Sequence, residues 1–176
     1  MKCFSMRFRC VLFLPLVLVT CVFAHADTHY VSTTGSDTPP YTSWETAATS
    51  IQAAIDAASE GDTVLIGQGT FRESIVMKSG LKLTGSGAGL TTMRALGASV
   101  VTCLNVNDVS IESLSITRGH PLWHGGGVHI EDSDQVVVRG CTIVDNRSEY
   151  GSGAGICALR SQGTIERCVI RNNRAE

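Results

Sequence analysis

The sequence Cys-Thr-Ile-Val-Asp-Asn at residues 141–146 returns, slightly changed, as Cys-Val-Ile-Arg-Asn-Asn at residues 168–173. The segment 109–119 matches both copies and lies one equal step earlier in the chain. Self-similarity at a fixed period of about 20 to 50 residues indicates a repeat architecture in which each copy stacks on its neighbours. This repeat therefore decides the fold class.

Each repeat contains three short stretches in which apolar and polar residues alternate. Alternation places one face of a strand inward and the other outward, and stacked copies bury the inward positions as ladders. The expected ladders are Val101/Val128/Ile156, Cys103/Ile130/Ala158, Ile111/Val138/Ile165, Leu114/Cys141/Cys168 and Ile116/Ile143/Ile170. Tight corners at Glu112-Ser113, Arg139-Gly140 and Glu166-Arg167 separate the second and third stretches. The sequence predicts an all-β solenoid with three strands per coil and about 27 residues per coil, which is a parallel β-helix.

A leucine-rich repeat has a similar period and is the main alternative. Residues 138–146 fit its LxxLxLxxN pattern, but that fold needs more leucine per unit and usually a helical turn on the return leg. Here the return leg, residues 147–155, is rich in glycine, which disfavours a helix, and a further strand follows. The pattern therefore favours the β-helix.

Residues 1–26 have the features of a secretory signal peptide: a basic start, an apolar run over residues 11–23 and an Ala-His-Ala ending. The run is shorter than the roughly 18 apolar residues that span a bilayer. A lipoprotein site at Cys21 fits poorly, because Thr20 precedes the cysteine. The sequence predicts an exported protein, extracellular or at the outer cell surface, with no transmembrane helix after cleavage.

Residues 27–60 are expected to form an N-terminal strand and a capping α-helix. The helix is expected over residues 43–58, where Ile51, Ala54 and Ile55 lie on one face. A β-helix has an open end whose strand edges need covering, and a short amphipathic helix suits that place. Residues 61–176 form the coils and end without a capping element, which predicts that the rest of a longer chain follows.

Charge and cysteine content narrow the function classes. After position 26 the chain carries 16 acidic and 11 basic residues, so its net charge is −5. A nucleic-acid partner needs a basic face and is not expected. The four cysteines after position 26 include no CxxC pair of the kind that binds zinc. Cys141 and Cys168 share an inward position, where stacked thiols are favoured because neighbouring parallel strands suit disulfide geometry poorly.

Two segments resemble known families. Residues 29–92, which include His-Tyr-Val-Ser-Thr-Thr-Gly-Ser-Asp and Gly-Asp-Thr-Val-Leu-Ile, resemble the N-terminal coils of secreted bacterial right-handed β-helix proteins of the pectin-lyase-like superfamily. The GGGVHI and CTIVDN segments are similar to the GG(G)I and FxxN repeats of polymorphic outer-membrane proteins, although Ile replaces Phe at 143 and 170. The resemblance implies a right-handed coil. It implies no single activity, since the superfamily contains lyases, hydrolases, epimerases and adhesins.

Aromatic and histidine residues on the loops are candidates for ligand binding. Trp123 and Tyr150 occupy equivalent places on successive loops, and exposed rings on stacked loops suit sugar binding. We therefore predict that Trp123, His124 and Tyr150 contact a polysaccharide or a cell-surface glycan. The alternative is that these rings cover the coil edge. A metal site formed by His124 with His120 and His129 is less favoured, because the loop varies between copies.

Acidic residues gather at the corner after the first strand of each coil. Asp108, Asp132 and Asp134 stack there, and Ca²⁺ prefers about six to eight oxygen ligands. Calcium is the one cofactor that the sequence suggests, and none is required. The alternative is a polar turn, in which Asp is an ordinary residue. The next coil offers Arg160 at this corner, which weakens the calcium prediction.

An enzyme of the superfamily is the alternative to a binding module. A polysaccharide lyase needs a base such as Arg118 or Arg139, and a glycoside hydrolase needs two carboxylates about 5 to 9 Å apart. Arg118 is expected to pair with Asp145 one coil away, and no constellation identifies a catalytic residue. The sequence thus favours a secreted or cell-surface binding module over the N-terminal part of a polysaccharide lyase or glycoside hydrolase.

Overall fold

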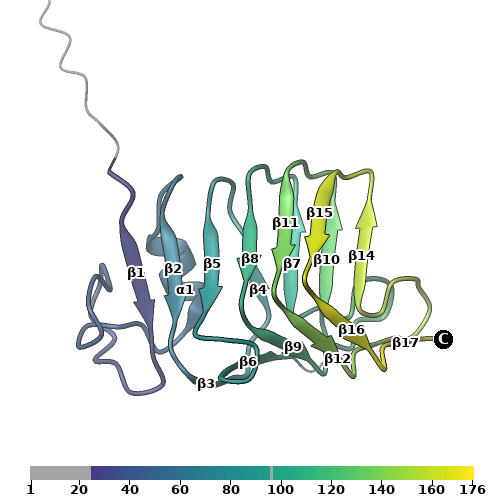
Figure 1. Ribbon diagram of the computed structural model, residues 1–176, viewed down its shortest axis with the longest axis horizontal. Helices are drawn as coiled ribbons and strands as arrows, with labels where there is room; N and C mark the ends of the chain where they lie inside the picture. Colours follow the sequence, from purple (N-terminus) through teal and green to yellow (C-terminus); the bar gives the residue numbers. More distant parts are fainter. Residues whose placement is uncertain (1–24, 96) are drawn as a thin grey trace, which may run out of the picture.

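The computed structural model describes residues 25–95 and 97–176, so nearly all of the predicted signal peptide lies outside the described residues. The described chain winds into a parallel solenoid whose sheets run along its length (Figure 1). The all-β fold with one short helix near the N-terminus is as the repeat predicted. In the described part, no helix has the length and apolar character needed to cross a membrane.

Three long parallel sheets form the walls of the solenoid. Sheet A contains, in spatial order, β1 (Thr28–Val31), β2 (Thr63–Ile66), β5 (Lys82–Gly85), β8 (Ser110–Glu112), β11 (Val136–Arg139) and β15 (Gly163–Glu166). Sheet B contains β3 (Gly69–Phe71), β6 (Thr91–Arg94), β9 (Ser115–Thr117), β12 (Thr142–Val144) and β16 (Val169–Arg171). Sheet C contains β4 (Ile75–Val76), β7 (Val101–Leu104), β10 (Val128–Glu131) and β14 (Ile156–Leu159). A small pair, β13 (Arg147–Ser148) with β17 (Arg174–Ala175), completes the coil.

The strand register confirms the predicted ladders. Val128 pairs with Val101 and Ile156, and the equivalent pairing in sheet B runs through Ile116, Ile143 and Ile170. In the middle coils these side chains are fully buried, so the side chains of successive coils stack into a continuous apolar core. The constant step of the later coils does not hold at the start, because Thr63 pairs with Lys82 after a much shorter stretch of chain.

The corners between sheets A and B turn sharply at the same place in successive coils. Ser113, Gly140 and Arg167 have φ values of 56°, 61° and 53°. This left-handed backbone turns the chain from one sheet into the next, as the sequence predicted for these corners. The glycine runs before sheet C have a different reason. A Cβ on Gly127 would lie 2.4 Å from the Gly155 carbonyl oxygen, so the stacked chains pass too closely there for any side chain.

The helix α1 (Ile51–Ala57) is shorter than the 43–58 helix that the apolar spacing predicted. Its buried face is as expected, with Ile51, Ala54 and Ile55 in the core, and it contacts β1, β2 and β4. The predicted start was wrong because the Ser43 and Thr46 side chains bond to each other's backbone N–H at 3.2 and 3.1 Å, which stabilises a turn. The helix therefore packs against the first strands of sheets A and C.

The last coil is the least buried. Ile165, Val169 and Ile170 stand at ladder or flanking positions of β15 and β16, and about half of each side chain is exposed. Their equivalents one coil earlier, such as Val138 and Ile143, are fully buried. The difference arises because a coil in this fold is covered by its neighbours on both sides.

Candidate functional site

The predicted aromatic pair forms in the structure. Trp123, on the loop between β9 and β10, lies beside Tyr150, on the loop between β13 and β14. The ring centroids are 5.8 Å apart and the planes are inclined at 49°. The side chains are 62% and 69% exposed, so both rings face solvent. The two loops are stacked by their backbones, since the Tyr150 N–H donates to the Leu122 carbonyl at 2.8 Å.

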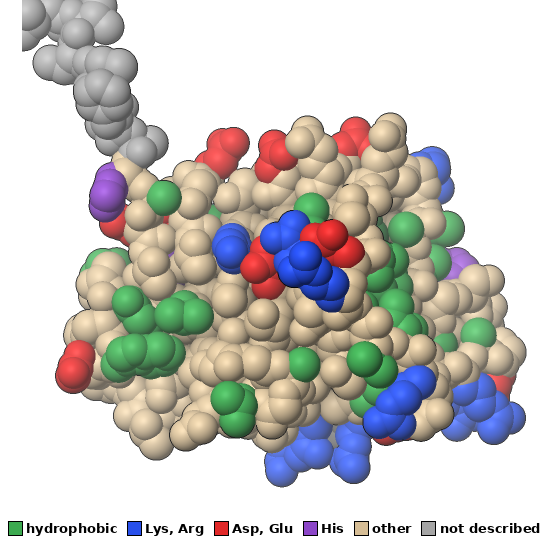
Figure 2. All heavy atoms as spheres, viewed as in Figure 1, with side chains coloured by type: hydrophobic (Ala, Val, Ile, Leu, Met, Phe, Trp, Pro, Cys, Tyr) green, Lys and Arg blue, Asp and Glu red, His purple; other side chains and the backbone are tan. Residues whose placement is uncertain are grey.

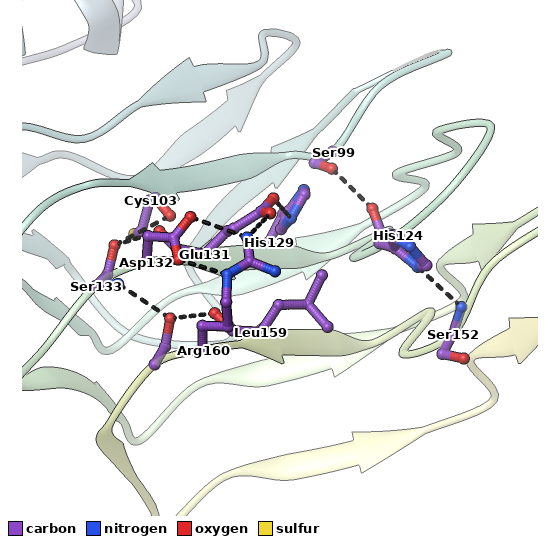
Figure 3. A network of polar contacts seen from close by, with 11 residues as sticks. Ser99, Cys103, His124, His129, Glu131, Asp132, Ser133, Ser152, Leu159 and Arg160 are labelled. Carbon is purple, nitrogen blue, oxygen red and sulfur yellow. Dashed lines mark hydrogen bonds and ion pairs between the residues drawn. The ribbon is translucent and has the colours of Figure 1, made fainter.

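His124 links the two loops instead of standing free beside the rings. Its Nδ1 accepts the Ser152 N–H at 3.1 Å, and its carbonyl oxygen accepts the Ser99 hydroxyl at 3.3 Å (Figure 3). These contacts connect three successive coils at the residue that follows Trp123. His124 therefore holds the loop that presents the tryptophan ring.

The three histidines do not converge on one point. His124 and His129 lie edge to face, 6.3 Å apart. His120 Nε2 lies 3.3 Å from a Glu149 oxygen and His129 Nε2 lies 3.2 Å from a Glu131 oxygen, each close but poorly aligned for a hydrogen bond. Within residues 25–95 and 97–176, no group of three or more His, Cys, Asp or Glu side chains could hold a metal ion.

The predicted calcium corner is occupied by an arginine. Arg160 donates to both oxygens of Asp132, through Nε at 2.6 Å and Nη2 at 2.9 Å, and also binds Glu131 (Figure 3). The hydrogen bond from Arg160 lowers the pKa of Asp132. Asp108 and Asp134 serve the turn, where the Asp108 N–H donates to the Asp134 carbonyl at 3.2 Å. The guanidinium already supplies positive charge here, so this arrangement does not favour calcium.

The two arginines considered as catalytic bases have different surroundings. Arg139 lies 3.7 Å from Glu112 and also pairs with Glu166, within a row of alternating charges over sheet A (Figure 2). The predicted ion pair of Arg118 with Asp145 was wrong. The Arg118 N–H donates to the Asp145 carbonyl at 3.3 Å, but Arg118 lines a cavity with Arg72 and Arg94 of the preceding coils, and its charge acts on Arg94.

The four described cysteines are all free thiols. Cys141 and Cys168 occupy the same place on adjacent coils, as the ladder predicted, and each thiol approaches the carbonyl of the residue two positions before it, at 3.4 and 3.3 Å. Burial raises the pKa of Cys141 to about 11. The stacked thiols are thus part of the core and do not present a nucleophile to an open cleft.

Comparison with known proteins identifies the fold and a surface-protein relative. The cell surface glycoprotein of Methanothermus fervidus is 32% identical over 100 residues, which are 56% of this chain and 15% of that protein. A pectin methylesterase, crystallised as a mutant with a hexasaccharide, matches with a TM-score of 0.53 and 16% identity over 81% of this chain and 51% of that one. The chain thus spans well under two thirds of either protein, and the second likeness concerns the fold alone.

The family assignment rests on the coils themselves. The family described as the right-handed β-helix region matches residues 55–176, from α1 to the last strand. That range covers all three long sheets except β1 and agrees with the parallel register of the strands. By its repeat, its topology and this match, the chain belongs to the right-handed β-helix family, within the pectin-lyase-like fold.

Proposed function

We propose that this chain is a β-helix module of an exported, cell-surface protein and that it binds glycan through Trp123 and Tyr150. The observation that carries the proposal is the exposure of two large rings side by side on stacked loops. Such rings offer apolar faces to the C–H faces of sugars, while the Trp N–H and Tyr O–H remain available as hydrogen-bonding groups.

The geometry of the pair limits how a ligand binds. A centroid separation of 5.8 Å is direct ring contact, within the range of about 4.5 to 7 Å typical of aromatic pairs. A sugar therefore lies across the two rings instead of between them. The 49° tilt gives the pair an angled surface that suits adjacent units of a chain. His124 acts as a positioning residue, because it fixes the Trp123 loop to the Ser152 backbone.

Surface presentation is supported by the relatives. The Methanothermus fervidus protein to which this chain is similar is named a cell surface glycoprotein. The pectin methylesterase with the related fold was crystallised with a hexasaccharide. Both are consistent with a surface or carbohydrate-related role for this chain, and the signal-like residues 1–26 are consistent with export.

Affinity gel electrophoresis against a panel of soluble polysaccharides tests the proposal. We expect the protein to be retarded by at least one polysaccharide, and Trp123→Ala and Tyr150→Ala each to weaken binding about tenfold, the effect of losing about 1.4 kcal/mol. Trp44→Ala is the matched control, because Trp44 is 46% exposed and packs on Tyr30 with centroids 4.7 Å apart, away from this pair.

Two results would count against this function. If both variants at the pair bind as the wild type does, or if Trp44→Ala weakens binding equally, the pair is not the binding surface. Release of reducing ends or of unsaturated products from a retained polysaccharide would instead favour the enzyme alternative.

A further inference from the structure

Three arginines from successive coils line one cavity on the sheet B side of the solenoid. Arg72 follows β3, Arg94 ends β6 and Arg118 follows β9. The cavity has a volume of about 330 Å³, and Glu73, Ser74 and Ala95 complete its lining. Neighbouring strands are about 4.8 Å apart, so the three side chains project from adjacent rungs of one wall. Basic side chains gather along the lower edge of the view in Figure 2, below β6 and β9.

Among the described residues, none of these three arginines has a counterion. Every acidic residue of the chain follows position 26 and lies in the described part, yet none of their carboxylates comes within 4.0 Å of the three guanidinium groups. The contrast with other arginines is clear: Arg139, Arg147, Arg160 and Arg174 each pair with a carboxylate. Within the described chain, isolated arginines such as Arg171 also lack a carboxylate partner, but Arg72, Arg94 and Arg118 are unpaired and line one cavity together.

Two carboxylates on the same side of the described solenoid, those of Glu73 and Asp145, form no ion pair with the cluster. Glu73 lines the cavity, but its oxygens accept the Ser50 hydroxyl at 2.8 Å and the N–H groups of Ile51 and Gln52 at 2.8 and 3.2 Å. Glu73 therefore holds the start of α1. Asp145 takes the place of Arg118 on the next coil and is exposed, while Arg118 lines the cavity with Arg94 of the preceding coil.

The central arginine, Arg94, is the one whose charge is least favoured by its surroundings. Arg94 is half-buried between the exposed Arg72 and Arg118. Burial lowers the pKa of Arg94, and the charges of Arg72 and Arg118 lower it further. Arginine nevertheless stays protonated in proteins, so the cavity carries three positive charges. Like charges on adjacent strands are destabilising, and an anion in the cavity would reverse that cost.

We propose that this cavity is a binding site for a tetrahedral oxyanion, a sulfate or phosphate group, which accepts hydrogen bonds from Arg72, Arg94 and Arg118. Guanidinium groups bind oxyanions through paired N–H donors. A tetrahedral group has at least three acceptor oxygens, one for each arginine, whereas a carboxylate has two.

The surroundings leave room for a larger molecule that carries the anionic group. Arg72 and Glu73 also line an adjoining depression of about 460 Å³, whose other residues are mostly hydroxyl-bearing: Thr33, Thr49, Ser50, Thr70 and Phe71. The bound group is therefore either a free inorganic ion or an ester on a hydroxyl-rich chain, and the two sources share the same contacts with the arginines.

Isothermal titration with sodium sulfate, sodium phosphate and sodium acetate at constant ionic strength tests the site. We expect one site per chain, with sulfate or phosphate at least tenfold tighter than acetate, and at least tenfold weaker binding in Arg94→Gln. Arg171→Gln is the matched control, because Arg171 ends β16 in the same sheet, three strands beyond β6, and is exposed. Its binding should equal that of the wild type.

Three results would overturn the site: equal affinity for acetate, unchanged binding in Arg94→Gln, or equal losses in Arg94→Gln and Arg171→Gln. If circular dichroism shows that Arg94→Gln does not fold, Arg118→Gln on the exposed turn carries the same expectation. The two sources of the anion are separated with dextran sulfate. If it binds far more tightly than inorganic sulfate while unmodified dextran does not bind, the natural ligand is an ester on a chain. If the affinity per sulfate group is equal, the natural ligand is the free ion. Trp123→Ala should bind sulfate normally, so this site and the glycan surface succeed or fail separately.

Discussion

Replacing Asn146 by alanine tests whether a buried asparagine ladder holds the coils together. Asn146 is 1% exposed. Its Oδ1 accepts the N–H of Gly119 at 2.9 Å, and its Nδ2 donates to the carbonyl of Ile116 at 3.1 Å, both one coil earlier. Alanine would leave the buried Gly119 N–H without the partner that Asn146 gives it, and such groups are almost always paired in native proteins. The Ile116 carbonyl keeps its place in the ladder between β9 and β12.

The expected loss follows from the one group that loses its partner. A buried polar group left unpaired costs about 1 to 3 kcal/mol, so the unpaired Gly119 N–H lowers the free energy of unfolding by about 2 kcal/mol. In a protein of this size, about 1 kcal/mol shifts the melting temperature by about 2 to 4 °C. Asn146→Ala should therefore melt about 4 to 8 °C below the wild type.

Asn173→Ala is the control, since it removes the same side chain one coil later, where it is half-buried. The Asn173 Oδ1 accepts the Asn146 N–H at 3.0 Å and its Nδ2 donates to the Ile143 carbonyl at 2.9 Å. Water can replace these partners, so we expect a loss of about 1 kcal/mol. Urea unfolding followed by circular dichroism, with equal m-values required, measures both. Equal losses in the two variants would refute the argument that burial sets the cost.

Two further predictions concern titration and thiol chemistry. Burial raises the pKa of Asp62, but two backbone N–H groups and the His29 ring outweigh it and hold the pKa below its ordinary value. The stability that Asp62 contributes is thus present above pH of about 4 and lost as pH falls through its folded pKa. The difference in unfolding free energy between wild type and Asp62→Asn should therefore become smaller on acidification. A constant difference in urea titrations at pH of about 7 and about 3 would contradict this. Burial also raises the pKa of Cys103 to about 12. Iodoacetamide at pH of about 8 should therefore modify the half-buried Cys168 before Cys103. Mass spectrometry that finds Cys103 modified first in the folded protein would contradict this order.

The coils could be predicted because the fold requires the same kind of residue at equivalent positions of successive coils. A ladder position such as Ile116, Ile143 and Ile170 needs an apolar residue in every coil, and the sequence shows this directly at a constant spacing. The adjacency of Trp123 and Tyr150 followed from the same register. The prediction weakened at the start of the chain, where the step from Thr63 to its partner Lys82 is much shorter and no constant period exists.

Because of the same irregular spacing, the arginine cavity was not predicted from the sequence. The steps from Arg72 to Arg94 and from Arg94 to Arg118 are both shorter than the step of the later coils, so alignment at that constant step does not place the three together. The Arg118–Asp145 pair failed for another reason. Register fixes which residues are neighbours, but not whether an exposed side chain leans toward the coil before it or the coil after it. In the structure Arg118 lines the cavity with Arg94 of the coil before it.

Comparison of two rows of charged side chains on this solenoid indicates that the arginine cluster is not a chance arrangement of surface charges. Over sheet A the charges alternate from coil to coil: Lys82 lies 3.1 Å from Glu112, which lies 3.7 Å from Arg139, which pairs with Glu166 (Figure 2). Opposite charges on adjacent strands stabilise a sheet and like charges destabilise it. On the sheet B side the row Arg72, Arg94 and Arg118 has one sign throughout, although the chain after position 26 is acidic overall. A row that is unfavourable for the empty fold and is balanced by an oxyanion is the arrangement expected of a binding site.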